Sequence, residues 1–385
     1  MKKPTSIILA LMLSAIMALP AFSASAAEQN KVEAQINGAV SYLYSGKTFG
    51  VLDSLDFLNI VRAGADVSKY VDAYTADVEK ELKENSGKLY YPIPQYDDEY
   101  NFIGTKDTEE LELYAAVIEI YDYLGLDFTD VAGYNLADIM TNCGLTACNG
   151  SNYYYYRIIT EACSIIDAPE KFVDAVMANI TSLYKMGEGT LFWGPGYCSA
   201  DDLGAFVAAL APYAYDYYDY IDDAVTLIEK SYSDQGYTNF GNANADTTAY
   251  VLMAYSSLFD TEMADRAYDL LCLFESDETG VFIYGTDKNS YATKDALMAL
   301  GYYLPCVYFS DDKDTEETTE PSTENNSNKT DSENTTKADA SKVDTSKAVK
   351  DESKKSPDTG NAAAVSAALI TAAGAVLFVA SRRRK

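Results

Sequence analysis

Apolar side chains recur every three or four residues in a set of segments along the chain, with charged residues between them. In one segment Ile221 and Ile228 share a helical face, whereas Asp222 and Glu229 fall on another. This spacing is typical of helices that bury one face and leave the other in water. It predicts such helices at Asp66–Glu84, Phe128–Met140, Pro169–Tyr184, Asp219–Ser231 and Glu262–Phe274, and Val32–Tyr44 supplies one more.

A second set of segments, which includes Leu111–Leu124 and Phe206–Tyr213, is apolar on nearly every side. This pattern indicates helices that are buried all round. Two of these segments begin with a similar four-residue sequence motif, SADD at 199–202 and NADT at 244–247. Each motif follows a loop rich in glycine and aromatic residues. Related starts at Asp53, Asp107, Asn152 and Thr293 bring the number of copies to six, about 47 residues apart.

Six buried helices that alternate with six half-exposed helices predict an all-α fold over residues 27–310. We expect an α6/α6 toroid, in which six parallel inner helices are surrounded by six outer ones. An open helical solenoid is the alternative. Closure is favoured because the repeats reach six and then give way to a polar segment.

The N-terminus has the order of a secretory signal peptide, with Lys2 and Lys3, an apolar run from Ile7 to Leu19 and then Ala-Ser-Ala at 24–26. We expect cleavage after Ala26, so that residues 1–26 are removed on export. A retained membrane anchor is the alternative.

The C-terminal part changes composition twice. Residues 311–355 are rich in acids, lysine, serine and threonine and contain no aromatic residue, which predicts a disordered stalk. Residues 356–385 follow with Ser-Pro-Asp-Thr-Gly, an uncharged apolar run at 362–380 and a basic tail. A run of this length spans about 28 Å as a helix, which predicts a transmembrane helix with the basic tail on the cytoplasmic side.

This three-part order resembles the cell-wall sorting signal of Gram-positive surface proteins, L-P-x-T-G followed by an apolar helix and a basic tail. Pro357, Thr359 and Gly360 match that signal, and Ser356 replaces its leucine. The resemblance implies that a sortase cuts between Thr359 and Gly360 and joins the chain to peptidoglycan. The protein is then expected in the cell wall, with its C-terminal helix in the membrane before sorting.

Composition excludes several functions. The chain has 59 acidic and 29 basic residues and a formal charge of −30, which argues against binding to a nucleic-acid backbone. It contains no histidine, so Ser-His-Asp and Cys-His nucleophile sites and histidine zinc sites are excluded. Acid–base chemistry, if the chain performs any, must use carboxyl, tyrosine, lysine or cysteine side chains.

The repeats at 48–66, 132–136, 199–213 and 244–258 resemble the prenyltransferase and squalene-cyclase-like toroids of secreted Gram-positive proteins, over residues 45–305. This resemblance implies the toroid fold, and such toroids include both enzymes and binding proteins. The D-x-D-D and D-D-x-x-D motifs of isoprenoid enzymes are absent from the sequence, which argues against isoprenoid chemistry.

Carboxylates start several inner helices, so a closed toroid would bring them to one rim. Asp201, Asp202, Asp246 and Glu110 are therefore the candidates for a glycosidase or lyase, which needs two carboxylates across a sugar. Capping of the helix N-terminus is the competing explanation for each of them. Asp201 and Asp202 fit this explanation least well as a pair, since a cap needs only one residue.

Aromatic residues in the loops before the same helices are candidates to contact a ligand. Trp193, Tyr197, Tyr237 and Phe240 form this group, which we combine with Asp201, Asp202 and Asp246 as the predicted ligand-binding rim. Packing in the core is the alternative for the tyrosines, which number 33 in the chain. Of the six cysteines, Cys143 and Cys148 flank a short loop and could form a disulfide. No metal or other cofactor is expected.

The sequence thus predicts a wall-anchored binding or adhesion module whose rim captures an extracellular ligand, such as a glycan or a host protein. A surface glycan-active enzyme that uses the rim carboxylates is the alternative. A spacer or coat protein without a small-molecule site is the third possibility.

Overall fold

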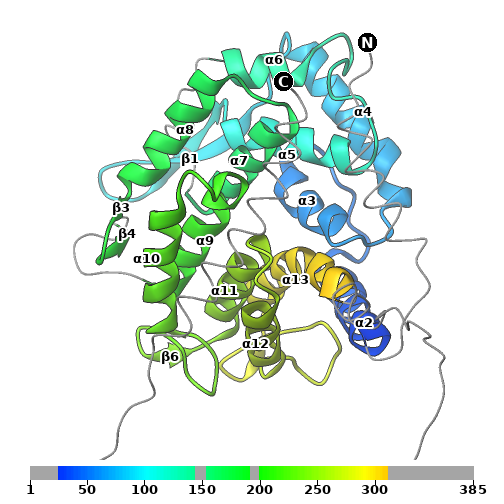
Figure 1. The fold of residues 1–385 in the computed structure, drawn as a ribbon. Helices are drawn as coiled ribbons and strands as arrows, with labels where there is room; N and C mark the ends of the chain where they lie inside the picture. Colours follow the sequence, from blue (N-terminus) through cyan, green and yellow to red (C-terminus); the bar gives the residue numbers. More distant parts are fainter. Residues whose placement is uncertain (1–24, 144–152, 191–198, 311–385) are drawn as a thin grey trace, which may run out of the picture.

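The computed structural model of the chain describes residues 25–143, 153–190 and 199–310. Over these ranges the chain forms twelve α-helices and four antiparallel two-stranded hairpins (Figure 1). The predicted all-α class is therefore confirmed at the level of helical content. The predicted signal peptide up to residue 24, the stalk and the sorting signal with Pro357, Thr359 and Gly360 lie outside the described residues.

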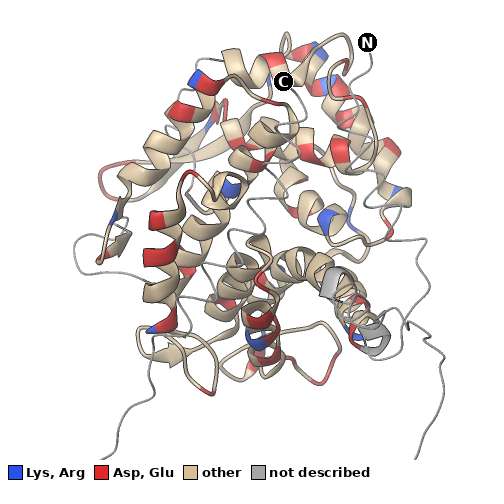
Figure 2. Cartoon of the chain, in the orientation of Figure 1, with Lys and Arg blue, Asp and Glu red and all other residues tan. Residues whose placement is uncertain are grey.

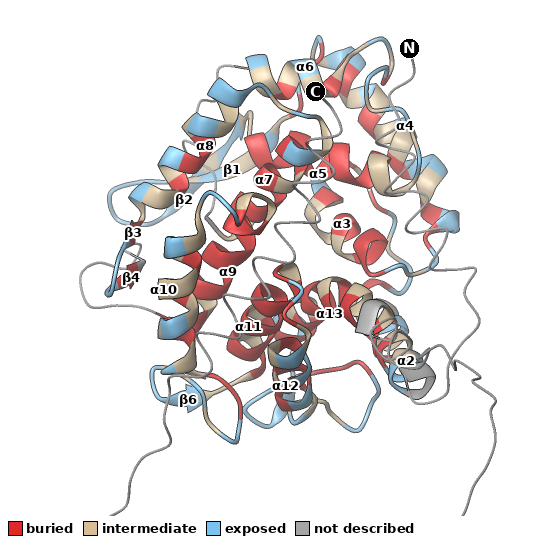
Figure 3. Ribbon diagram, viewed as in Figure 1, coloured by how far each residue is buried: buried red, intermediate tan, exposed pale blue. Residues whose placement is uncertain are grey.

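Six helices, which we call the inner helices, are buried along most of their length (Figure 3). In α5 every residue from Leu111 to Tyr121 is buried, because its sequence is apolar on almost all sides. In α9 all residues except Asp201 are buried. The inner helices are α3 (Ser54–Arg62), α5 (Leu111–Tyr123), α7 (Tyr156–Ile165), α9 (Ala200–Leu210), α11 (Ala245–Ser257) and α13 (Ser290–Ser310).

The other six helices bury one face and expose the other, and we call them the outer helices. In α10, Ile221, Ala224 and Ile228 are buried, while Asp219 is exposed. Acidic side chains are frequent on these helices (Figure 2). The outer helices are α2 (Ser25–Tyr44), α4 (Ser68–Glu84), α6 (Leu136–Asn142), α8 (Glu170–Ser182), α10 (Tyr218–Glu229) and α12 (Thr261–Cys272).

The contacts among the inner helices follow the chain and then return to its start. Each inner helix contacts the next, from α3 through α5, α7, α9 and α11 to α13, and α13 also contacts both α3 and α2. The Lys294 ammonium of α13 lies 3.1 Å from an Asp56 carboxylate oxygen of α3, and Tyr308 donates a 2.9 Å hydrogen bond to Glu33 of α2. Segments more than 200 residues apart are thereby joined.

Glycines allow α2 to approach the loop before α13 very closely. A Cβ atom on Gly38 would lie 1.9 Å from the Thr279 carbonyl oxygen. A Cβ atom on Gly280, which has a φ of +78°, would lie 2.0 Å from the Gln35 carbonyl oxygen. Both positions exclude any larger residue, because the atoms in the way belong to the backbone.

Four hairpins lie on the segments that lead into inner helices, and the sequence analysis did not predict them. The longest, β1 (Tyr91–Tyr96) with β2 (Phe102–Thr108), precedes α5. The others are only two residues long in each strand: β3 (Tyr184–Lys185) with β4 (Gly189–Thr190), β5 (Thr238–Asn239) with β6 (Asn242–Ala243), and β7 (Ile283–Tyr284) with β8 (Asp287–Lys288).

Three predicted boundaries were wrong. Residues 128–135 are not helical, because Ala132 and Gly133 adopt positive φ angles and Asn135 caps a helix that starts at Leu136. Asp107 lies in strand β2 rather than at a helix start. The last inner helix starts at Ser290, three residues before the predicted Thr293, because Asn289 accepts the backbone N–H bonds of Tyr291 and Ala292.

The caps of α9 and α11 are not the predicted aspartates. Ser199 caps α9 by accepting a 3.1 Å hydrogen bond from the Asp202 N–H. Asn244 caps α11 by accepting a 2.8 Å bond from the Thr247 N–H. The capping explanation is therefore wrong for the carboxyl groups of Asp201 and Asp246. Asp202 fits it, because its carboxyl group accepts a hydrogen bond from the backbone N–H of the cap residue Ser199.

Replacing Asn244 with alanine is expected to lower the free energy of unfolding by about 1 kcal/mol, because the Thr247 N–H loses its acceptor. The matched change Asp246→Asn, two residues further on, removes no cap and should not destabilise the chain. Urea denaturation of both variants measures the difference. Equal losses in the two variants would show that Asn244 does not act as the cap.

Within the described residues, no helix is both long enough and apolar enough to cross a membrane. The predicted transmembrane run at 362–380 lies outside them. Helix α2 begins at Ser25 and includes Ala26, the predicted last residue of the signal peptide.

Candidate functional site

Carboxyl groups gather where the inner helices begin. Asp201 and Asp246 lie in the first turns of α9 and α11, and Asp295 lies in the second turn of α13. The charge of Asp201 raises the pKa of Asp246, and the charges of Asp246 and Asp201 both raise the pKa of Asp295, so the three groups are electrostatic neighbours. With Asp202 they form what we call the carboxyl cluster.

Burial raises the pKa of every member of the carboxyl cluster, since the charged form loses its hydration. The pKa of Asp295 rises to about 8, that of Asp202 to about 7 and that of Asp246 to about 6. The pKa of Asp201 is also raised. Near neutral pH the cluster therefore contains protonated and ionised carboxyl groups together, which is the combination that acid–base chemistry requires.

Neighbouring side chains hold two members of the cluster in place. The Tyr154 hydroxyl, just before α7, donates a 2.9 Å hydrogen bond to Asp202 Oδ1. The Asn239 amide, in β5, donates a 3.0 Å bond to Asp201 Oδ2. One oxygen of Asp246 is buried without a hydrogen-bond partner among the described residues, so it can accept a further donor.

Glu110 lies at the start of α5, but its contacts differ from those of the carboxyl cluster. Burial and the charge of Glu112 raise its pKa to about 7. It occupies the N-cap position of α5 and makes no side-chain capping bond. Glu110 thus shares the raised pKa of the predicted site, and its electrostatic neighbour is Glu112.

The aromatic residues of the predicted rim differ in their exposure to solvent. Phe240 lies at the tip of the β5–β6 hairpin and is 75% exposed. Tyr237 is fully buried, and its hydroxyl accepts a 2.7 Å bond from Arg266 of α12, so its assignment to a ligand-contacting rim was wrong. Trp193 and Tyr197 lie outside the described residues.

Exposed aromatic side chains occur on other hairpins that lead into inner helices. Tyr284 lies on the β7–β8 hairpin, and Tyr291, which is 75% exposed, lies at the start of α13. The β1–β2 hairpin carries exposed Tyr100 and Phe102. The hairpins that lead into these helices thus present aromatic rings to solvent.

Asp295 is the member that sequence reasoning missed. It lies two residues after Thr293, the predicted start of the sixth repeat, so alignment with the starts at Asp201 and Asp246 could have indicated it. In the structure α13 starts three residues before Thr293, so Asp295 lies one turn inside the helix, whereas Asp201 and Asp246 lie in the first turns of theirs.

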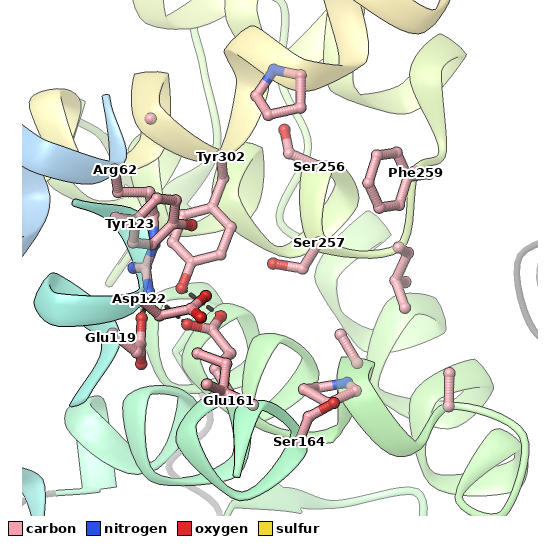
Figure 4. Close-up of a pocket in the computed structure, with 17 residues that line it drawn as sticks. Arg62, Glu119, Asp122, Tyr123, Glu161, Ser164, Ser256, Ser257, Phe259 and Tyr302 are labelled. Atoms are coloured by element: carbon pink, nitrogen blue, oxygen red, sulfur yellow. Dashed lines mark hydrogen bonds and ion pairs between the residues drawn. The ribbon is translucent and has the colours of Figure 1, made fainter. Parts of the chain in front are cut away.

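A cavity of about 300 Å³ lies at the opposite end of the inner helices, and the sequence analysis did not predict it (Figure 4). Its lining includes Arg62 at the end of α3, Ser257 at the end of α11 and Ala211 just after α9. Residues at or near the ends of α3, α5, α7, α9 and α11 thus meet at this cavity, away from the carboxyl cluster at the helix starts. We call this cavity the helix-end pocket.

A buried arginine network forms one wall of the helix-end pocket (Figure 4). Arg62 donates to Glu119 and Glu161, and its guanidinium lies 4.4 Å from the centre of the Tyr302 ring. Tyr302 donates to Glu161 and accepts a 3.1 Å bond from Arg157. The side chains of Arg62 and Glu119 are only 3% and 1% exposed, whereas that of Glu161 is 19% exposed.

Glu119 is the least solvated acid of this network. Burial raises its pKa well above the usual value and the charge of Glu161 adds to this effect, while Arg62 and Arg157 oppose it. One oxygen of Glu119 is buried without a hydrogen-bond partner among the described residues.

Neither the cysteines nor the acids form a metal site in the described ranges, where no cluster of three or more His, Cys, Asp or Glu could hold a metal ion. Cys163 and Cys306 are buried thiols whose pKa burial raises to about 12. The predicted Cys143–Cys148 disulfide cannot be followed, because Cys148 lies outside the described residues.

No family model and no curated protein matches this sequence.

Proposed function

We propose that the chain is a wall-anchored surface protein whose domain is an α6/α6 toroid that binds glycan at the starts of its inner helices. The toroid is supported by the order of contacts, in which α13 returns to α3. The signal peptide, stalk and sorting signal that support wall anchoring come from the sequence. Sortase and peptidoglycan are then the partners of the C-terminal segment.

The observation that carries glycan binding is the combination of exposed aromatic rings with a carboxyl cluster at the same helix starts. An aromatic face packs against the apolar face of a sugar ring. Carboxylate oxygens accept hydrogen bonds from sugar hydroxyls, and one oxygen of Asp246 has capacity left. The proposed ligand contacts are Phe240, Asp201 and Asp246, with Trp193 and Tyr197 from the segment outside the described residues. Asp202 is fully buried, as Tyr237 is, so it is not one of these contacts.

A second candidate function, glycan hydrolysis or elimination, is favoured by the different pKa values within the carboxyl cluster. Asp295, with a pKa of about 8, is protonated at neutral pH and could serve as the general acid. Asp246, with a pKa of about 6, is mostly ionised there and could serve as the base or nucleophile. The same groups serve binding, so the two candidates differ only in whether a bound glycan is consumed.

A glycan array incubated with the full-length chain tests the proposal. Phe240→Ala and Asp246→Asn are each expected to weaken a specific signal about tenfold, since each removes one proposed contact. Tyr215→Ala is the matched control, because Tyr215 is 70% exposed and follows α9 at the other end. It should leave the signal unchanged.

Each outcome of this experiment has a definite meaning. Cleavage of a bound glycan that Asp295→Asn abolishes would assign the enzyme function. Stable binding without cleavage would assign the binding module. Absence of any glycan signal from a folded sample would contradict both and leave the spacer or coat function.

A further inference from the structure

The β1–β2 hairpin presents a group of large apolar side chains to water. Tyr96, Tyr100, Phe102 and Ile103 are 57%, 88%, 62% and 65% exposed. They surround the turn of the hairpin, which is exposed throughout (Figure 3). Among the described elements, β1 and β2 make an extended contact only with each other. A contiguous apolar group of this kind marks a surface that a partner covers, since a hairpin of two strands is only marginally stable in water.

The pairing of the two strands places several of these side chains on one face. Along β1, Pro94 and Tyr96 point to the same side, and their partners on β2 are Thr105 and Phe102. The rings of Tyr96 and Phe102 lie 6.1 Å apart. Ile103 is an extra residue on β2, because the register of the strands shifts by one residue at this point, and such a bulge turns a side chain out of the ladder.

The outer edge of β1 is closed to a further strand. Pro92 and Pro94 have no backbone N–H, and a proline within a strand points its nitrogen away from the ladder. The Gln95 side-chain amide donates a 3.3 Å hydrogen bond to the Pro94 carbonyl oxygen. At these positions the edge therefore offers no donor, and the Pro94 acceptor already has one.

The outer edge of β2 is open by the same geometry. Asp107 and Thr105 lie opposite the two prolines. In an antiparallel pair, opposite residues that exchange no hydrogen bonds point their N–H and C=O groups away from each other. Both residues are exposed, and no third strand pairs with β2 among the described residues. Strand β2 therefore offers a row of backbone donors and acceptors to an extended chain.

The charge of the hairpin indicates what kind of chain fits this edge. The stretch from Tyr96 to Asp107 contains four acids and a single base, Lys106, and all five are exposed. The whole chain has a formal charge of −30, so a second copy, a nucleic acid or an anionic membrane surface would be repelled. A basic polypeptide would be attracted.

We propose that the open edge of β2 binds an extended segment of a basic protein, which adds a third strand to the hairpin. The backbone groups of Thr105 and Asp107 pair with the segment. Its basic side chains lie beside Asp107 and the acidic turn, and its apolar side chains pack against Phe102. This surface contains none of the proposed glycan contacts, so the two proposals can fail independently.

Isothermal titration calorimetry of the full-length chain with three matched peptides tests the proposal. The first peptide, Lys-Thr-Phe-Thr-Lys-Thr-Phe-Thr-Lys, has lysine and phenylalanine on one face of a strand. The second has glutamate in place of every lysine. The third keeps the lysines and has proline in place of the two threonines that flank the central lysine. We expect one lysine peptide to bind per chain, about tenfold more tightly than either of the others. Added salt should weaken it.

Three variants locate the site. Thr105→Pro should weaken the lysine peptide about fivefold, because it removes one outward N–H and leaves the bonds between β1 and β2 in place. Phe102→Ala and Asp107→Asn should also weaken it, since each removes a side-chain contact. The controls are Tyr215→Ala, at an exposed aromatic residue after α9, and Asp72→Asn, at an exposed acid of α4. Both should leave the affinity unchanged.

The proposal is overturned if a folded wild-type chain does not bind the lysine peptide, or if the glutamate or proline peptide binds equally well. Sedimentation velocity tests the second copy: a wild-type dimer that Phe102→Ala dissociates would show that another copy of this chain covers the hairpin, which also overturns the proposal. Circular dichroism establishes that each variant is folded. If Thr105→Pro does not fold, the proline peptide and the comparison of Phe102→Ala with Tyr215→Ala decide the outcome.

Discussion

A chain in which methionine replaces Arg62 is expected to lose about 3–5 kcal/mol of its free energy of unfolding. Arg62 is the partner of both Glu119 and Glu161, and the Glu119 side chain is 1% exposed. Without the guanidinium, two acids face each other in a site from which water is largely excluded. Urea denaturation monitored by circular dichroism measures the loss.

A double variant distinguishes the lost ion pair from lost packing. Arg62→Met combined with Glu119→Gln should recover part of the stability, because the second change removes the uncompensated buried charge. Lys80→Met is the control, since Lys80 pairs with Glu84 on the exposed surface of α4, where such pairs contribute about 0–1 kcal/mol. If the loss in Arg62→Met were as small as in Lys80→Met, the network would have no structural role.

Stability is expected to fall as the pH rises from 5 to 8, with a decrease of about 5–10 °C in Tm. The pKa values of Asp295, Asp202 and Asp246 rise from 3.8 to about 8, 7 and 6 on folding. Between pH 4 and 8 the folded chain therefore holds protons that the unfolded chain has released. Linkage then makes the folded state less stable as these protons are lost, and the full contribution is present only below about pH 4.

Asp295→Asn should flatten this pH dependence and raise Tm at pH 8, because the amide stays neutral at every pH. Differential scanning calorimetry between pH 5 and 8 tests both statements. The control is Asp98, an exposed acid in the turn between β1 and β2, since Asp98→Asn should leave the slope unchanged. A steeper slope in Asp295→Asn than in the wild type would contradict the assignment of the proton to this group.

The helices could be predicted from the sequence because their burial depends on local spacing. Residues such as Ile221 and Ile228 repeat on one face of α10, and α5 is apolar on nearly every side. The two-residue strands could not be predicted in this way, since β5 and β6 hold two residues each and carry no alternation. Their turn is marked only by Phe240 and Gly241, both with positive φ angles.

The carboxyl cluster could be predicted in part, and the helix-end pocket could not. Asp201 and Asp246 occur in similar sequence motifs, so a comparison of the repeats finds them. The comparison could not show that Ser199 and Asn244 would form the helix caps. Arg62 and Tyr302 contact each other across 240 positions of sequence. No local pattern relates them, and an arginine in a helix is ordinarily read as a surface residue.

The contacts of α13 with α2 and α3 have a consequence for the order in which the chain can fold. Part of the surface of α2 and α3 is covered by residues 290–310, so this part has no partner until almost the whole domain has been synthesised. Joining them closes a loop of more than 200 residues, which is slow because the entropic cost precedes the gain from contacts. A polypeptide that is still being synthesised therefore remains incompletely folded until its last helix is available. Removal of α13 should leave a trapped, aggregation-prone species rather than a smaller folded domain.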